Sequence, residues 1–299
     1  MLTGEMKPVS PVVANIHIAV HKVVNPESSV VVFPAQRGPK DTKAHVLWRA
    51  VALAVLILAG GNSCGGTTVV AIRGDDYVVL GSDSMIIQTT GDRNVSMPAC
   101  KIQQMSGVFF AAAGVFGGPG FNAYEIAKEA SSKGADTVTT ANRFERAARG
   151  PFTTFVRRLR RENPTAFSRY CNDRDCLQVA FAGFEKGTPK LAIRSFRVTT
   201  RGASTLVVRD ARMDCPGDCV TGAEQVVLGV NGEATSVFDS TPHFWKLRGI
   251  VLGMDELIGT EILTHGDVVG PPVSVLILDK EGARWMPGHQ GFCHDPKDK

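Results

Sequence analysis

Residues 65–84 read GGTTVVAIRGDDYVVLGSDS, and this stretch decides how the folded part of the chain begins. Two apolar runs, Thr67–Arg73 and Tyr77–Ser82, flank the turn Gly74-Asp75-Asp76. β-branched residues favour strands, and Gly and Asp between two such runs favour a tight turn. The stretch therefore predicts an antiparallel hairpin.

Beyond this hairpin, runs of strands alternate with runs of helices. The expected strands are Val108–Ala113, Leu177–Phe184, Leu191–Val198, Thr205–Arg209, Gln225–Val230 and Val273–Leu278. The expected helices are Phe121–Lys133, Ala141–Arg161 with an interruption or kink at Gly150-Pro151, and a helical region from Pro242 to about Leu263. This order predicts an α+β domain in which two packed sheets carry helices on both outer faces.

Composition separates an N-terminal extension, residues 1–66, from one folded domain, residues 67–299. The 299 residues are 43% hydrophobic and 21% charged, which excludes a mostly disordered, collagen-like or multi-span membrane protein. The chain has a net charge of +4, but residues from Gly65 onward comprise 27 basic and 26 acidic side chains. Since the folded part is almost neutral, we expect no nucleic-acid partner.

The extension contains a segment typical of an export signal. Lys43, His45 and Arg49 precede the apolar run 50–59, and small or polar residues follow as far as Cys64. Ten apolar residues are too few to cross a hydrocarbon core of about 30 Å. We therefore favour a periplasmic or secreted protein and hypothesise that translation starts downstream of Met1. The alternatives are a membrane or lipid anchor and a cleaved propeptide of a cytoplasmic protein; residues 1–45 are expected to be poorly ordered.

The spacing of three polar residues resembles a known family. Gly66-Thr67 is followed by Asp83, sixteen positions after Thr67, and then by Lys101. This pattern is similar to β-type subunits of the proteasome and the related bacterial ATP-dependent protease, which are N-terminal-nucleophile hydrolases. In that family a Gly-Thr bond is cut autocatalytically, and an Asp and a Lys follow at these intervals. The gap before Lys101 is two residues longer here, and the resemblance covers roughly Gly66 to Trp285.

The resemblance implies a four-layer αββα sandwich and a threonine-type peptidase matured by cleavage between Gly66 and Thr67. It further implies that Gly114 supplies the oxyanion hole and that Asp267 helps to orient the charged groups. Two positions depart from the family: Asn231 stands where a serine is usual, and Gly270 stands where a serine would follow Asp267. Because Asn231 can still donate and accept hydrogen bonds, we expect unusual or slow hydrolysis rather than an inactive subunit.

The chemistry requires these residue types independently of the family. A threonine hydroxyl is a poor nucleophile, but a free α-amine, with a pKa of about 7.7–8.0, can act as its base. Lys101 would lower the proton affinity of both groups, and Asp83 would be the partner that a buried ammonium needs. Each residue taken alone also has an ordinary structural explanation. Thr68 is the second candidate nucleophile, although the interval to Asp83 favours Thr67.

Cysteine spacing bears on the compartment. Removal of Cys64 with a signal leaves six cysteines, among which the local pairs Cys171/Cys176 and Cys215/Cys219 favour disulfides and agree with export. Free thiols and a zinc site are the alternatives; we expect neither a metal nor a cofactor. The seven arginines between positions 143 and 161 are interpreted as the solvated or ring-interface face of an amphipathic helix rather than a site for an acidic partner.

The expected substrate is a peptide or a protein. The alternatives are a non-catalytic proteasome-like structural subunit and a small-molecule amidase of the same fold. The resemblance also implies a homo-oligomeric ring, whereas ring size, an ATPase or regulatory partner and cleavage preference do not follow from the sequence.

Overall fold

The computed structural model describes residues 62–63, 67–90, 93–132, 134–201, 205–219 and 224–296. These residues form an α+β fold of antiparallel sheets with six helices. No helix in these ranges is both long enough and apolar enough to cross a membrane.

The first sheet contains the expected hairpin. Its strands, in spatial order, are β13 (Glu224–Gly229), β2 (Thr68–Arg73), β3 (Tyr77–Ser82), β14 (Ser274–Asp279) and β15 (Gly282–Trp285). Val70 of β2 lies opposite Gly81 of β3, and the turn closes with a 2.9 Å hydrogen bond from the Gly74 N–H to the Tyr77 carbonyl. The predicted hairpin is confirmed.

The second sheet packs against the first. Its order is β12 (Thr205–Cys215), β11 (Thr188–Arg201), β10 (Arg174–Glu185), β7 (Val108–Gly114) and β6 (Ile102–Met105). One apolar core contains inward-facing residues of both sheets, including Val69 and Leu80 from the first and Phe109, Ala111 and Ala180 from the second. Alternate residues of these strands face this core. The residues between them face the helices on the outer side of each sheet.

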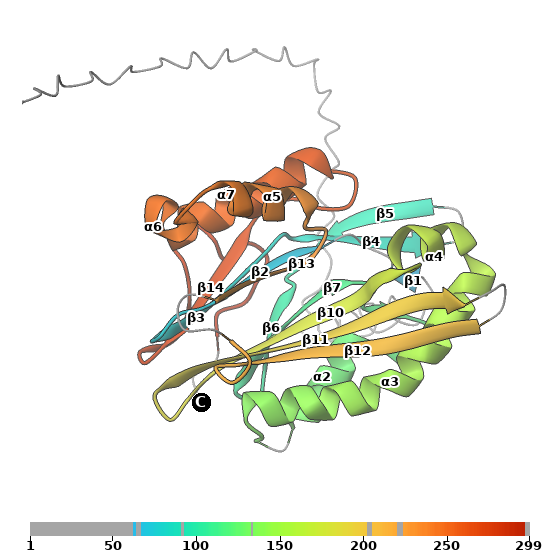
Figure 1. Ribbon diagram of the computed structural model, residues 1–299, viewed down its shortest axis with the longest axis horizontal. Coiled ribbons are helices and arrows are strands. Elements are labelled where there is room, and N and C mark those ends of the chain that lie inside the picture. The colour runs from blue at the N-terminus through green and yellow to red at the C-terminus, as the bar shows by residue number, and fades with distance from the viewer. Residues whose placement is uncertain are drawn as a thin grey trace, which may run out of the picture. The chain divides into compact units, whose positions relative to one another are not determined.

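Helices α2 (Ala123–Ser131) and α3 (Thr137–Glu162) cover the outer face of the second sheet (Figure 1). Phenylalanine rings join them to the strands: the centroids of Phe144 and Phe181 lie 5.4 Å apart, and those of Phe152 and Phe196 lie 5.3 Å apart. The short helix α4 (Pro164–Tyr170) follows α3. Edge-to-face and tilted contacts of this kind add stability beyond the area that the rings bury.

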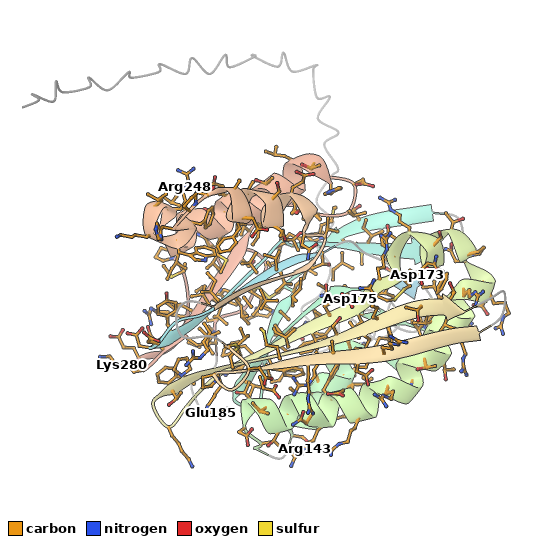
Figure 2. The ribbon with its side chains drawn as sticks, in the orientation of Figure 1. Arg143, Asp173, Asp175, Glu185, Arg248 and Lys280 are labelled. Carbon is orange, nitrogen blue, oxygen red and sulfur yellow. A yellow bond between two sulfur atoms is a disulfide. The ribbon has the colours of Figure 1, made fainter. Side chains whose placement is uncertain are left out.

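Helices α5 (Gly232–Ser240), α6 (Phe244–Arg248) and α7 (Ile250–Thr264) lie on the outer face of the first sheet (Figure 1). Met254 and Leu257 of α7 pack with Val70 and Val79 of the sheet in a separate buried cluster. Figure 2 shows side chains filling the space between the layers, with the labelled Arg143, Arg248 and Lys280 at the periphery.

A small third sheet lies where the two large ones end near the predicted site. Its order is β5 (Arg93–Pro98), β4 (Met85–Thr90), β1 (Asn62–Ser63), β8 (Gly117–Gly118) and β9 (Phe121–Asn122). The strand β1 belongs to the N-terminal extension, so part of this extension is paired within the fold.

One helical prediction needs correction, and a second is confirmed as two separate helices. Helix α3 continues through Pro151 without the expected interruption, because Phe144, Ala148, Phe152 and Phe155 form one continuous buried face that outweighs the lost backbone hydrogen bond. The region from Pro242 onward divides at Gly249, whose φ of +72° ends α6. Sequence periodicity missed the helices α4 and α5 and the short strands β1, β4, β5, β6, β8, β9 and β15.

The packing of α7 predicts that two of its leucine positions, Leu257 and Leu263, respond differently to truncation. Leu257 is 0% exposed and Leu263 is 89% exposed, and both lie in the same helix. Leu257→Ala should lower the free energy of unfolding by about 2–5 kcal/mol through lost burial and a cavity. Leu263→Ala should change it by less than about 0.5 kcal/mol. Equal effects in urea denaturation would contradict the packing of α7 described here.

Candidate functional site

Thr67, Asp83 and Lys101 meet at the end of the first sheet, and all three are buried. Thr67 immediately precedes β2, Asp83 follows β3, and Lys101 precedes β6. The Lys101 Nζ atom lies 3.0 Å from the Thr67 Oγ1 atom and 2.8 and 2.9 Å from the two carboxylate oxygens of Asp83. One ammonium therefore contacts both the hydroxyl and the carboxylate.

The Asp83 carboxylate is also held by backbone donors. Its Oδ1 atom accepts a hydrogen bond from the Thr68 N–H at 3.0 Å, and its Oδ2 atom accepts from the N–H groups of Met85 and Gly270, both at 3.1 Å. Three backbone donors and one ammonium compensate for the loss of water around a buried carboxylate. The carboxylate that contacts Lys101 is consequently held in place by the backbone donors of Thr68, Met85 and Gly270.

Burial lowers the pKa of the Lys101 ammonium, and the neighbouring Asp83 carboxylate opposes that shift. The Lys101 main chain is also fixed, because the Tyr124 hydroxyl donates to the Lys101 carbonyl at 3.0 Å. Burial raises the pKa of the Tyr124 phenol well above its ordinary value, so this donor keeps its proton.

The end of β13 holds the Thr67 main chain. The Val230 N–H donates to the Thr67 carbonyl at 2.9 Å, and the Thr68 hydroxyl donates to the Val230 carbonyl at 2.7 Å. Gly229 has a φ of +83°, and any Cβ at this position would collide with the Thr67 carbonyl. The Gln178 Oε1 atom accepts from the Gly229 N–H at 2.7 Å. Only glycine allows the chain to pass this close to Thr67.

Gly114 ends β7 next to this group. Its φ is +82°, a Cβ there would collide with the Cys176 carbonyl, and the following Val115 N–H donates to the same carbonyl at 2.7 Å. The preceding Ala113 side chain faces Gly229 together with the Thr67 carbonyl. Gly114, the predicted oxyanion residue, therefore directly follows Ala113, which lies beside the Thr67 main chain.

Two predicted site residues have other contacts. The side chain of Asp267 is 61% exposed, and its Oδ2 atom lies 2.5 Å from Arg169 Nη2. That hydrogen bond, together with the charge of Arg169, lowers the pKa of the Asp267 carboxyl. The expected role of Asp267 in orienting the charged groups is corrected, because its carboxylate contacts Arg169. The contact of this loop with the site is the hydrogen bond from the Gly270 N–H to Asp83. The side-chain amide of Asn231 donates to the Val227 carbonyl at 3.1 Å, whereas the adjacent Val230 contacts Thr67.

Gly66 and the Gly66–Thr67 bond lie outside the described residues, as do Cys64 and the signal-like run 50–59. The strand β1 is described, and its last residue, Ser63, precedes Thr67 by four positions. Ser63 pairs antiparallel with Gln88 of β4 on one side and with Gly117 of β8 on the other. Strand β1 therefore lies between β4 and β8.

Three disulfides lie within the described residues. Cys171 bonds to Cys176 and Cys215 to Cys219, as the sequence suggested, which argues against a zinc site at these cysteines. The third bond, Cys100–Cys293, joins positions 193 residues apart and was not predicted. The same ranges hold no group of three or more His, Cys, Asp or Glu residues suited to a metal ion.

Several residues of the site carry only weak sequence signals. Gln178 is the single amide in the apolar segment Leu177–Phe184, and a polar residue in a buried strand is such a signal. Tyr124, Gly229 and Val230 take their roles from long-range contacts, which local patterns do not specify.

No protein-family model matches the chain, and no curated protein matches it. The candidate site therefore rests on its own geometry.

The crowding at Gly229 predicts a position-specific effect of adding a methyl group. Gly229→Ala and Gly187→Ala both place alanine at a positive φ, but the space around Gly187 is open. Backbone strain should lower the free energy of unfolding of each variant by about 1 kcal/mol. Gly229→Ala should lower it further, because the new methyl group collides with the Thr67 carbonyl. Chemical denaturation measures both, and equal losses would contradict the close approach.

The Asp83–Lys101 pair predicts strong energetic coupling. Asp83→Asn or Lys101→Met alone should lower the free energy of unfolding by about 3–5 kcal/mol, because each leaves a buried charge without its partner. In the double variant, the free energy of unfolding should fall by much less than the sum of the two single losses. Additive losses in a double-mutant cycle would show that the two charges do not compensate each other.

Proposed function

We propose that this protein is a threonine-type peptidase that hydrolyses peptide bonds with Thr67 as its N-terminal nucleophile. The observation that carries the proposal is the 3.0 Å contact between Lys101 Nζ and Thr67 Oγ1, with the same ammonium bound by Asp83. A buried ion pair is costly to maintain, and one aimed at a hydroxyl is characteristic of an activated nucleophile.

Maturation would use the same hydroxyl. Thr67 Oγ1 attacks the Gly66 carbonyl carbon, and its proton passes to the Thr67 nitrogen. The bond from that carbon to the nitrogen then breaks, which leaves the acyl group on the oxygen as an ester and the nitrogen as an amine. Water then hydrolyses the ester, releasing the leader with a carboxylate and leaving Thr67 with a free amine. Lys101 favours these steps because its positive charge stabilises the oxygen as it loses its proton.

In the mature enzyme, the new amine would serve as the general base for the Thr67 hydroxyl. The Lys101 charge would keep the pKa of this amine low enough for it to be neutral near physiological pH. Negative charge that develops on the substrate carbonyl oxygen would be met by the Gly114 N–H, at the position where β7 ends beside the Thr67 main chain.

The position of β1 supports a peptide as substrate rather than a small amide. This strand occupies the space between β4 and β8 through main-chain pairing on both sides. When the leader departs, the two strand edges offer the same pairing to another extended chain. A small amide would not use such edges.

The arrangement of two sheets between helices supports assignment to the four-layer αββα sandwich of the N-terminal-nucleophile hydrolases. Three disulfides support an oxidising compartment and hence an exported protein. Assembly into a homo-oligomeric ring stays a prediction from the resemblance. The non-catalytic subunit and the small-molecule amidase stay as the alternatives to the peptidase.

Substitution of the two adjacent threonines tests the proposal. We expect Thr67→Ala to retain the leader, because no hydroxyl is present to attack the Gly66 carbonyl, and Thr67→Ser to be processed. Thr68→Ala is the matched control and should still be processed, since the Thr68 hydroxyl donates to Val230 and does not contact Lys101. Intact mass and N-terminal sequence measure the outcome.

The proposal fails if Thr67→Ala yields chains that begin at residue 67, or if mature wild-type chains begin upstream of Thr67. Processed wild-type protein that cleaves none of a mixed peptide library would favour the non-catalytic subunit. Cleavage of simple amides with no peptide cleavage would favour the amidase.

A further inference from the structure

The disulfide Cys100–Cys293, which the sequence did not predict, includes the residue that precedes Lys101. Cys100 directly precedes Lys101, and Cys293 is 6% exposed in the segment that follows β15. The other two disulfides join residues only five and four positions apart. Cys100–Cys293 therefore links the residue before Lys101 covalently to a segment 193 positions away.

The segment that carries Cys293, residues 286–296, is itself attached to the first sheet. The Met286 N–H donates to the Val275 carbonyl at 2.9 Å, and the Val275 N–H donates to the His289 carbonyl at 2.8 Å. His289 Nε2 lies 2.9 Å from an Asp255 carboxylate oxygen of α7. These contacts make the segment a fixed support for the disulfide.

This support also touches the residues around Asp83. Gly291 packs so closely on Ser274 that a Cβ would collide with the Ser274 hydroxyl, and Ser274 Oγ lies 3.4 Å from Ser84 Oγ. A Cβ at Gly291 would also touch the Ser84 hydroxyl, and Ser274 pairs with Ser82 in the sheet, so the C-terminal segment borders Ser84 directly and Ser82 through Ser274. The same segment thus contacts the Asp83 region and is bonded to the residue before Lys101.

We propose that the Cys100–Cys293 disulfide is a positioning element that holds Lys101 against Asp83 and Thr67, so that activity depends on the thiol redox state. The inference rests on the proposed function and adds a regulatory property to it. The four-carbon side chain of Lys101 has a limited reach, so a shift of the main chain at residues 100 and 101 moves the ammonium out of hydrogen-bond distance of Thr67 and Asp83. The Tyr124 hydroxyl restrains the carbonyl of Lys101, and the disulfide restrains the residue before it.

The redox step is a two-electron exchange. A dithiol reductant gives two electrons and two protons to the Cys100–Cys293 bond, which becomes two thiols, and the reductant becomes a cyclic disulfide. Without this bond, residues 286–296 retain only non-covalent contacts with the sheet and α7, and Cys100 is free to move away from Cys293.

The test compares Cys100→Ser/Cys293→Ser with the control Cys215→Ser/Cys219→Ser, which removes a local disulfide at the end of β12. The first readout is reductive methylation of folded protein, with Lys101 and the exposed Lys186 quantified by mass spectrometry. Lys101 is fully buried, and we expect its methylation to rise about tenfold or more only when the 100–293 bond is absent. Lys186 should react equally in all variants.

The second readout is the pH dependence of kcat/KM with a peptide substrate. When Lys101 moves away, the pKa of the Thr67 amine rises because a neighbouring positive charge is lost, so the acidic limb shifts to higher pH. We expect kcat/KM at neutral pH to fall about 10- to 100-fold, and the control variant to keep the wild-type profile. A merely destabilising change would lower the amount of active enzyme without moving the limb.

Unchanged Lys101 methylation in the folded 100/293 variant overturns the positioning role, as does an unchanged pH profile in processed enzyme. If that variant does not fold, wild-type protein partially reduced after folding and capped with iodoacetamide gives the comparison, between species capped at Cys100 and Cys293 and species capped only at Cys215 and Cys219. If wild-type chains are never processed, the proposed function fails, but methylation of Lys101 still decides whether the disulfide positions it.

Discussion

The buried contact between Lys101 and Asp83 is the interaction on which the site depends. A lysine ammonium without water needs a counter-charge, and the buried Asp83 carboxylate needs hydrogen-bond donors of its own. Backbone N–H groups of Thr68, Met85 and Gly270 supply them. Segments far apart in the sequence must therefore be correctly placed before the ammonium can face the Thr67 hydroxyl.

The antiparallel topology meets this requirement by bringing strand ends together. Strand β2 begins at Thr68, β3 ends at Ser82, β7 ends at Gly114 and β13 ends at Gly229, all at the same end of the paired sheets. Strand interiors supply the rigid core, and the residues just beyond the strands supply the chemistry. The positive φ values of Gly114 and Gly229 let backbone approach backbone where a side chain would not fit.

The sequence was sufficient for those features that local patterns determine. Two β-branched apolar runs around the turn Gly74-Asp75-Asp76 predicted the β2–β3 hairpin. The resemblance carried by the interval from Thr67 to Asp83 predicted which side chains meet near Lys101. The surface contact of Asp267 was not predictable, because its partner Arg169 lies 98 positions away in the sequence. This arginine binds the Asp267 carboxylate at the surface. The continuity of α3 through Pro151 and the bond between Cys100 and Cys293 likewise depend on tertiary packing, which periodicity does not encode.

The central claim is that the Thr67 oxygen forms the covalent bond to substrate. The most direct measurement treats processed protein with a peptide β-lactone, an electrophile that acylates an activated hydroxyl, and locates the adduct by tandem mass spectrometry. The account predicts one acyl group per chain, on Thr67, in chains that begin at Thr67 and not in unprocessed chains. An adduct on another residue, or mature chains that remain unmodified, would contradict it.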